Sequence, residues 1–206
     1  MPDETPRHPV SPLRMGDAAP DFEARSTHGP VRLSGYRGRW LVFFSHPADF
    51  TPVCTTEFVA LAKAHERFAA LDCALLGLSV DSLYSHLAWA RAIRDLFSVD
   101  IPFPVIEDPS MLVGRAYGMI DESAENSAGV RATYFIDPNG IIRAMTHYPL
   151  TIGRSVDEMV RMVMALQATS SGEKLAPVDW QPGQPLLLPA NEEVQQDADW
   201  FCRRET

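Results

Sequence analysis

Two short runs of apolar residues, each followed by a long amphipathic stretch, restrict the fold of this chain more than any other feature. WLVFFS at 40–45 precedes apolar residues at helical spacing over 55–71, and CALLGLSV at 73–80 precedes a second helical pattern over 81–96. Short strands without a polar face are typically buried on both sides. Their alternation with helices predicts an α/β domain built on a central sheet.

The second half of the chain continues this alternation and then adds a hairpin. IPFPVIEDP at 101–109 predicts a short strand, and SMLVGRAYGM at 110–119 predicts a short helix that ends at glycine. Residues 130–149 read as two strands joined at Asp-Pro-Asn-Gly, a turn signal. The sheet is therefore expected to be mixed, with helices on its faces.

Two of the predicted helices carry start signals. Asp81 or Ser82 can cap the helix that follows 73–80. Ser155 precedes the last amphipathic stretch, and Glu158 stands three residues later at capping-box spacing. These signals set the expected beginnings of both helices.

The chain of 206 residues is expected to form one domain with an appendage. Residues 1–171 are assigned to the α/β domain. Residues 172–206 are rich in proline and lack periodicity, so we expect an extended C-terminal arm that contributes to dimerisation.

Charge and composition limit the partners. The formal net charge is −9 and the isoelectric point is about 5.1, which argues against a nucleic-acid binder. The apolar runs are too short to span a membrane, and residues 1–15 lack the apolar region of a secretory signal. The three cysteines, at 54, 73 and 202, are an odd number and widely spaced, which indicates a reducing compartment. A cytoplasmic protein is expected.

The segment HPADFTPVC at 46–54 places a cysteine where a helix begins. The nucleophilic form of cysteine is the thiolate, and the unsatisfied N–H groups at a helix N-terminus favour negative charge. The hydroxyl of Thr51 is expected to lie beside the Cys54 sulfur, while Pro47 and Pro52 stiffen the loop. This combination predicts a reactive thiol.

A fixed cation would further favour the thiolate. Arg131 interrupts the apolar strand VRATYFI, and a charged residue in a buried strand is costly unless it is paired. Glu57 stands one helical turn after Cys54 and is the expected partner that orients Arg131.

The motif Pro-x-x-x-Thr-x-x-Cys in PADFTPVC resembles the active-site motif of the peroxiredoxins, and SHPADFTPVCTTEF resembles their one-cysteine subgroup. LLGLSVDSLYSHLAWARAI, FPVIEDP, TYFIDPNGIIR and VDWQPG are also similar to that subgroup, over 16–183. The resemblance implies a thioredoxin-like fold, no cofactor, and reduction of hydrogen peroxide and organic hydroperoxides by a peroxidatic cysteine.

Residue roles carry over where the motif matches. The resemblance implies that Cys54 attacks the peroxide and becomes a sulfenic acid, with Thr51 and Arg131 holding the two peroxide oxygens. Pro47 is expected to shield the reaction. The residues themselves suggest the same roles. Cys54 would be the activated nucleophile, and Thr51 and Arg131 would donate hydrogen bonds where negative charge develops.

Two further side chains have competing interpretations. His46 can hydrogen-bond the peroxide or an oxidised sulfur, as in relatives, or simply close a turn. Arg154 matches a second arginine near the site in the subgroup, although exposed loop arginines are common.

Other cysteine and metal chemistries fit the sequence less well. Cys73 begins an apolar strand and is expected in the core. A dithiol–disulfide oxidoreductase needs Cys-x-x-Cys, and Thr51 occupies the position of the other cysteine. The remaining histidines have no ligand spacing, so no metal is expected. A peroxide sensor or a ring-forming holdase could use the same cysteine and stays open.

Partners follow from the edge strand, the arm and the resemblance. The strand at 141–148 is expected at a sheet edge, where pairing forms a homodimer, and the resemblance extends this to a decamer. Cys202 is expected to resolve the sulfenic acid of the partner subunit, since some microbial relatives end in a similar Trp-Phe-Cys. Those relatives often carry another cysteine where this chain has Gln196. An external thiol reductant such as a thioredoxin-like protein would then restore the enzyme.

Overall fold

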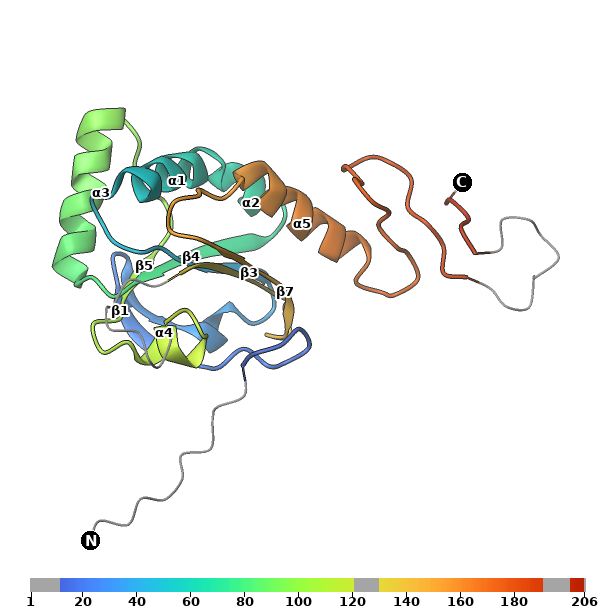
Figure 1. Cartoon of the computed structure of the whole chain (residues 1–206), viewed down its shortest axis with the longest axis horizontal. Helices are drawn as coiled ribbons and strands as arrows, with labels where there is room; N and C mark the ends of the chain where they lie inside the picture. Colours follow the sequence, from blue (N-terminus) through green and yellow to red (C-terminus); the bar gives the residue numbers. More distant parts are fainter. Residues whose placement is uncertain (1–11, 121–129, 191–200, 206) are drawn as a thin grey trace, which may run out of the picture.

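The computed structural model of the chain describes residues 12–120, 130–190 and 201–205, and these contain a mixed seven-stranded sheet in the order β2-β1-β5-β4-β3-β6-β7 (Figure 1). The strands are β1 (Glu23–Ser26), β2 (Gly29–Arg32), β3 (Trp40–Ser45), β4 (Cys73–Ser79), β5 (Val105–Glu107), β6 (Arg131–Ile136) and β7 (Ile142–Tyr148). Neighbours β3, β4 and β5 run parallel, whereas β1, β2, β6 and β7 pair antiparallel. The predicted mixed sheet is confirmed.

Helices cover both faces of this sheet. They are α1 (Pro52–Lys63), α2 (His65–Ala69), α3 (Leu83–Phe97), α4 (Leu112–Ala116) and α5 (Val156–Ala168), with a 3-10 turn η1 at Leu33–Tyr36. Figure 1 shows α1, α2, α3 and α5 on one face and α4 on the other. Within the described residues, no helix is long and apolar enough to cross a bilayer.

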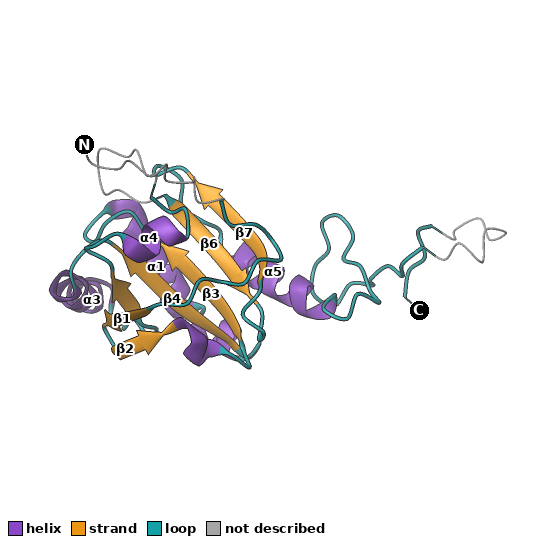
Figure 2. Ribbon diagram, turned by 90° about the horizontal axis from the view of Figure 1, so that it is seen from below, coloured by secondary structure: helices purple, strands orange, loops and turns teal. Residues whose placement is uncertain are grey.

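Strand β3 explains the division of the core into two layers. All six of its residues are buried, and they alternate between the faces. Val42 and Phe44 join the cluster beneath α1, α3 and α5, whereas Leu41 and Phe43 join the cluster beneath α4. A strand enclosed on both sides explains why WLVFFS has no polar face; Figure 2 shows the strands lying between the helices.

The helix beginnings follow the predicted caps in part. The Ser82 hydroxyl accepts a hydrogen bond from the Ser85 N–H at 3.3 Å, and Ser155 accepts one from the Glu158 N–H at 3.2 Å. The Glu158 carboxylate bonds to Arg161 and does not turn back toward the cap, so the capping box is only half formed.

The helical pattern over 55–71 is divided into two helices in the structure. Helix α1 begins earlier, at Pro52, which suits the first helical position because proline has no N–H to leave unsatisfied. It ends at Lys63, and Ala64 separates it from α2. Cys54 therefore lies within the first turn of α1, rather than before the helix.

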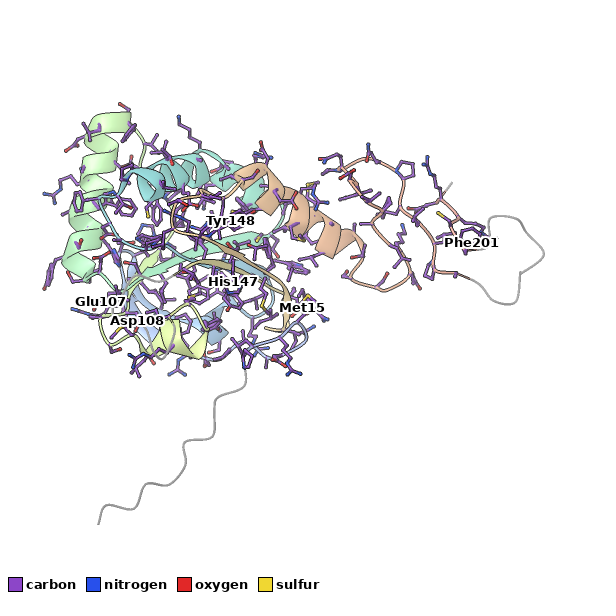
Figure 3. All side chains as sticks on the ribbon, viewed as in Figure 1. Met15, Glu107, Asp108, His147, Tyr148 and Phe201 are labelled. Atoms are coloured by element: carbon purple, nitrogen blue, oxygen red, sulfur yellow. The ribbon has the colours of Figure 1, made fainter. Side chains whose placement is uncertain are left out.

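The arm after α5 packs on the domain at its near end. Trp180 and Leu186 are buried against Ala165 of α5, and Leu187 forms isolated bridges with Leu175 and Arg204. The arm extends away from the sheet, with Phe201 on its far part (Figure 3). Cys202 is exposed there, whereas Gln196 lies outside the described residues.

Candidate active site

The site forms where β3 ends and antiparallel β6 begins, at one end of these two interior strands. The Ser45 hydroxyl donates to the Val130 carbonyl at 2.6 Å and accepts from the Ala132 N–H at 3.1 Å. These bonds tie the end of β3 to the start of β6. The loop from β3 to α1 and the residue Arg131 are thereby brought to the same place.

Cys54 and Arg131 meet at this end of the two strands. The Cys54 side chain is fully buried, with 0 % exposure, and the Arg131 guanidinium Nη1 lies 3.3 Å from its Sγ. The residues are 77 positions apart in the chain. The guanidinium is therefore placed to donate a hydrogen bond to the sulfur. The predicted pairing of a helix-start cysteine with a cation is present.

Thr51 occupies the N-cap position of α1, but its hydroxyl does not cap the helix. The Thr51 Oγ1–H donates to the Ala48 carbonyl at 2.9 Å. In this conformation its proton is directed at the loop backbone instead of the Cys54 sulfur, because the tight turn brings Ala48 O within reach. Pro47 lies half-buried in the same loop.

Glu57 links two arginines beneath the thiol. Its Oε2 accepts from Arg131 Nη1 and from Arg154 Nη2, both at 2.8 Å. All three side chains are at most 3 % exposed. Burial alone would raise the pKa of Glu57, but the hydrogen bonds and charge of Arg154, with the charge of Arg131, lower it. Two guanidiniums and one carboxylate leave a net positive charge beside Cys54.

Arg154 is a structural part of this network. Its backbone N–H and Nε donate to Glu57 Oε1 at 2.7 and 2.9 Å, and its Nη1 donates to the Ala132 carbonyl at 3.0 Å. Its guanidinium carbon also lies 5.2 Å from the centre of the Phe44 ring. The alternative of an exposed loop arginine is therefore wrong.

His46 lies in a second buried cluster that the sequence did not reveal. The two oxygens of Asp49 are 2.9 Å from His46 Nε2 and 2.8 Å from His86 Nδ1. Burial opposes the ionised form of Asp49, but the hydrogen bonds from both histidines hold its pKa well below its usual value. His86 lies 40 positions after His46, so spacing along the chain gave no signal.

Among the residues that the structure describes, His46, Asp49 and His86 form the group that could hold a metal ion. Their ligand atoms lie within 4.8 Å of one another. Each Asp49 oxygen already accepts a hydrogen bond from one ring, so a metal would have to displace both N–H protons. Direct hydrogen bonds account for this arrangement without an ion.

Cys73 lies on β4 and behaves as a core residue. It is 6 % exposed and packs in the cluster beneath α1 and α5. Burial raises the pKa of its thiol to about 12, so it stays protonated at neutral pH. This confirms its placement in the core.

Replacing Glu57 by glutamine should destabilise the fold by about 3–5 kcal/mol, because it leaves two buried guanidiniums without their counter-ion. The pKa of Glu57 is lowered below its ordinary value of 4.5, so its stabilisation is complete above that pH and is lost as the pH falls through the folded-state pKa. Urea unfolding at neutral and acid pH measures this difference.

Glu66→Gln serves as the matched control, because its side chain is 94 % exposed on the neighbouring helix α2. The control should unfold like the wild type at both pH values. Equal stability of Glu57→Gln and Glu66→Gln at neutral pH would contradict the role given to the Glu57 network.

A buried cysteine in the first turn of a helix, beside an arginine from a neighbouring strand, is the arrangement expected of a thiol-based oxidoreductase. Comparison with known proteins gives the family. Residues 15–145 match the AhpC/TSA family, and residues 165–199 match the C-terminal domain of 1-Cys peroxiredoxin. The chain belongs to the AhpC/TSA family of peroxiredoxins, and it is a peroxidase.

Relatives and solved structures agree with this assignment. Peroxiredoxin 2 of Thermoplasma acidophilum is 51% identical over 82% of this chain and 84% of its own length. A peroxiredoxin of Aquifex aeolicus is 51% identical over 84% of this chain and 78% of its own. The yeast mitochondrial 1-Cys peroxiredoxin has a TM-score of 0.83 at 34% identity, with 93% of this chain and 98% of that chain covered. These neighbours confirm the thioredoxin-like fold.

Proposed function

We propose that this peroxidase reduces hydrogen peroxide and organic hydroperoxides through Cys54. The Cys54 thiolate attacks one peroxide oxygen, the O–O bond breaks, and the products are a Cys54 sulfenic acid and an oxyanion that takes a proton to become water or an alcohol. The observation that carries this assignment is the Arg131 guanidinium 3.3 Å from Cys54 Sγ. Its charge favours the thiolate and stabilises the leaving oxygen.

The neighbouring residues have supporting roles in this proposal. Glu57 fixes the orientation of Arg131, and Arg154 keeps Glu57 ionised and in place. Thr51 can accept a hydrogen bond from the peroxide through the lone pairs of its hydroxyl. Pro47 limits access of water to the sulfur.

Multiple turnover separates this enzyme from a peroxide sensor. Peroxide consumption by the purified chain should continue well beyond one equivalent when a thioredoxin-like protein, glutathione or dithiothreitol is supplied in turn. Consumption that stops at one equivalent with every reductant would favour a sensor that passes its oxidation to a partner. The same assay with hydrogen peroxide and with an alkyl hydroperoxide gives the substrate preference.

We propose further that Cys202 resolves the sulfenic acid of the partner subunit. Cys202 is exposed, and it follows Phe201 on the part of the arm that lies away from the sheet (Figure 3). A disulfide needs Cα atoms within about 7 Å, and Cys54 is fully buried, so exchange requires local opening around Cys54. Condensation of the Cys202 thiol with the sulfenic acid releases water and leaves a disulfide that an external dithiol reduces.

One equivalent of peroxide should therefore produce a disulfide-linked dimer on a non-reducing gel. The band should disappear in Cys54→Ser and in Cys202→Ser, but persist in Cys73→Ser, because the Cys73 thiol is buried in the core. A wild type that stays monomeric on the gel, without an intrachain disulfide by mass, would rule out this resolving role.

We also propose how the chain assembles, how its two regions divide the work, and where it is located. Strand β7 lies at the edge of the sheet and is mostly half-buried, which suits pairing with a second copy into a dimer and, from dimers, a decamer. The domain over 1–171 would carry the chemistry and the arm over 172–206 would support assembly. The absence of a structural disulfide among the described cysteines suits the cytoplasm.

A further inference from the structure

A cavity lies where β3 and β4 begin, at the opposite end of these strands from the site at Cys54. Its volume is about 470 Å³, which falls within the range of small-molecule sites, about 300–1,000 Å³. The six residues of β3 separate the two places by about 17–20 Å. The cavity is therefore distinct from the site at Cys54.

One part of the cavity lining is apolar. It includes Val31 of β2, Leu75 of β4 and Phe103, which precedes β5. Leu75 and Phe103 are buried, with at most 2 % of each residue exposed, so the fold holds them in place. A fixed apolar wall of this kind suits a ligand with an apolar side chain or ring.

Arg39 and Asp72 bring opposite charges to the same cavity from two neighbouring strands. They directly precede Trp40 and Cys73, which are register partners in the parallel pair of β3 and β4. In the part of the chain that the structure describes, neither charged group forms an ion pair or a hydrogen bond. The Arg39 guanidinium instead lies over the Tyr36 ring, 4.9 Å from its centroid.

Both charges lie close to the thiol of Cys73, which also lines the cavity. Burial is the main cause of the raised pKa of Cys73; the charge of Asp72 raises this pKa further, whereas the charge of Arg39 lowers it. A carboxylate and a guanidinium that share a cavity without pairing leave places for one cation and one anion. His28 and His65 add ring nitrogens that can hydrogen-bond to a bound molecule.

We propose that this cavity binds a free α-amino acid with a large apolar side chain. Its carboxylate pairs with Arg39, its ammonium group pairs with Asp72, and its side chain lies on the apolar wall. A simple anion would also meet the Asp72 carboxylate, and a simple cation would also meet Arg39. Only a molecule that carries both charges uses both groups.

Isothermal titration calorimetry of the full chain tests this proposal with four probes. L-Phenylalanine should bind saturably at millimolar concentration. 3-Phenylpropionate lacks the ammonium group, phenethylamine lacks the carboxylate, and alanine lacks the ring. Each of these three should bind at least about tenfold more weakly than phenylalanine, because each leaves one part of the lining without its partner.

Substitutions locate the binding in this cavity. Arg39→Met and Asp72→Asn should each weaken the binding of phenylalanine at least about tenfold. Arg94→Met and Asp95→Asn are the matched controls, because these side chains are 53 % and 66 % exposed on α3, outside the cavity. Both controls should keep the wild-type affinity. Thermal unfolding without ligand checks that each variant is folded.

Ala69→Phe is a second kind of variant, which keeps both charges. Ala69 lines the cavity from the last residue of α2, so a phenylalanine side chain there should fill the space and abolish binding. It decides the location of the site if a charge variant does not fold.

Three results would overturn the proposal. They are the absence of saturable binding of phenylalanine, equal affinity for phenylalanine and 3-phenylpropionate, and wild-type affinity in the folded cavity variants. Cys54→Ser should bind phenylalanine like the wild type, because the two places are separate. Failure of the peroxide chemistry assigned to Cys54 would therefore leave the calorimetric result unchanged.

Discussion

Replacing Cys54 by serine should reduce peroxide turnover to background, a loss on the order of 10³-fold or more. The serine hydroxyl is not ionised at neutral pH, and oxygen cannot form the sulfenic acid that carries the oxidising equivalent. The Arg131 guanidinium, which lies 3.3 Å from Cys54 Sγ, would then face a hydroxyl that cannot react with peroxide. The measurement is consumption of hydrogen peroxide with a thiol reductant in excess.

Cys73→Ser and Cys202→Ser are the matched variants for this experiment. Cys73→Ser should keep its turnover because that thiol is buried and protonated in the core. Cys202→Ser should keep the first oxidation of Cys54 and lose only its resolution by the arm. Substantial turnover in Cys54→Ser would show that another residue is the nucleophile.

Replacing Arg131 by methionine should slow the reaction of Cys54 with peroxide by about 10²–10³-fold, the usual effect of removing one preorganised donor to a developing negative charge. Methionine retains much of the apolar stem but none of the N–H donors. The variant also frees the Leu150 carbonyl, to which Arg131 Nε donates at 3.1 Å, so thermal unfolding must accompany the kinetics. Stopped-flow oxidation under single turnover isolates the peroxide step.

Arg143→Met on strand β7 is the control for charge removal. Arg143 pairs with Asp137 at 2.7 Å and its side chain is 48 % exposed, away from the cluster at Glu57. This variant should oxidise at the wild-type rate. If Arg131→Met were oxidised at the same rate as Arg143→Met, Arg131 would have no role in the peroxide step.

Much of the fold could be predicted from the sequence because its signals are local. The apolar run at 40–45 marks a strand that is buried on both faces, and the Asp-Pro-Asn-Gly turn marks the hairpin of β6 and β7. Ser82 and Ser155 mark the starts of α3 and α5. The break at Ala64 was missed, because the apolar spacing continues through it.

For the site, the sequence by itself determined the cysteine at the helix start, the flanking prolines and the charged residue in an apolar strand. Those features depend on neighbours along the chain and on the cost of burying an unpaired charge. Only the tertiary structure decided that Glu57 accepts hydrogen bonds from both Arg131 and Arg154. It likewise decided that the Asp49 carboxylate is shared by His46 and His86. These groups come from separate strands, helices and loops. Their hydrogen bonds and their burial exist only after the fold has brought those elements together.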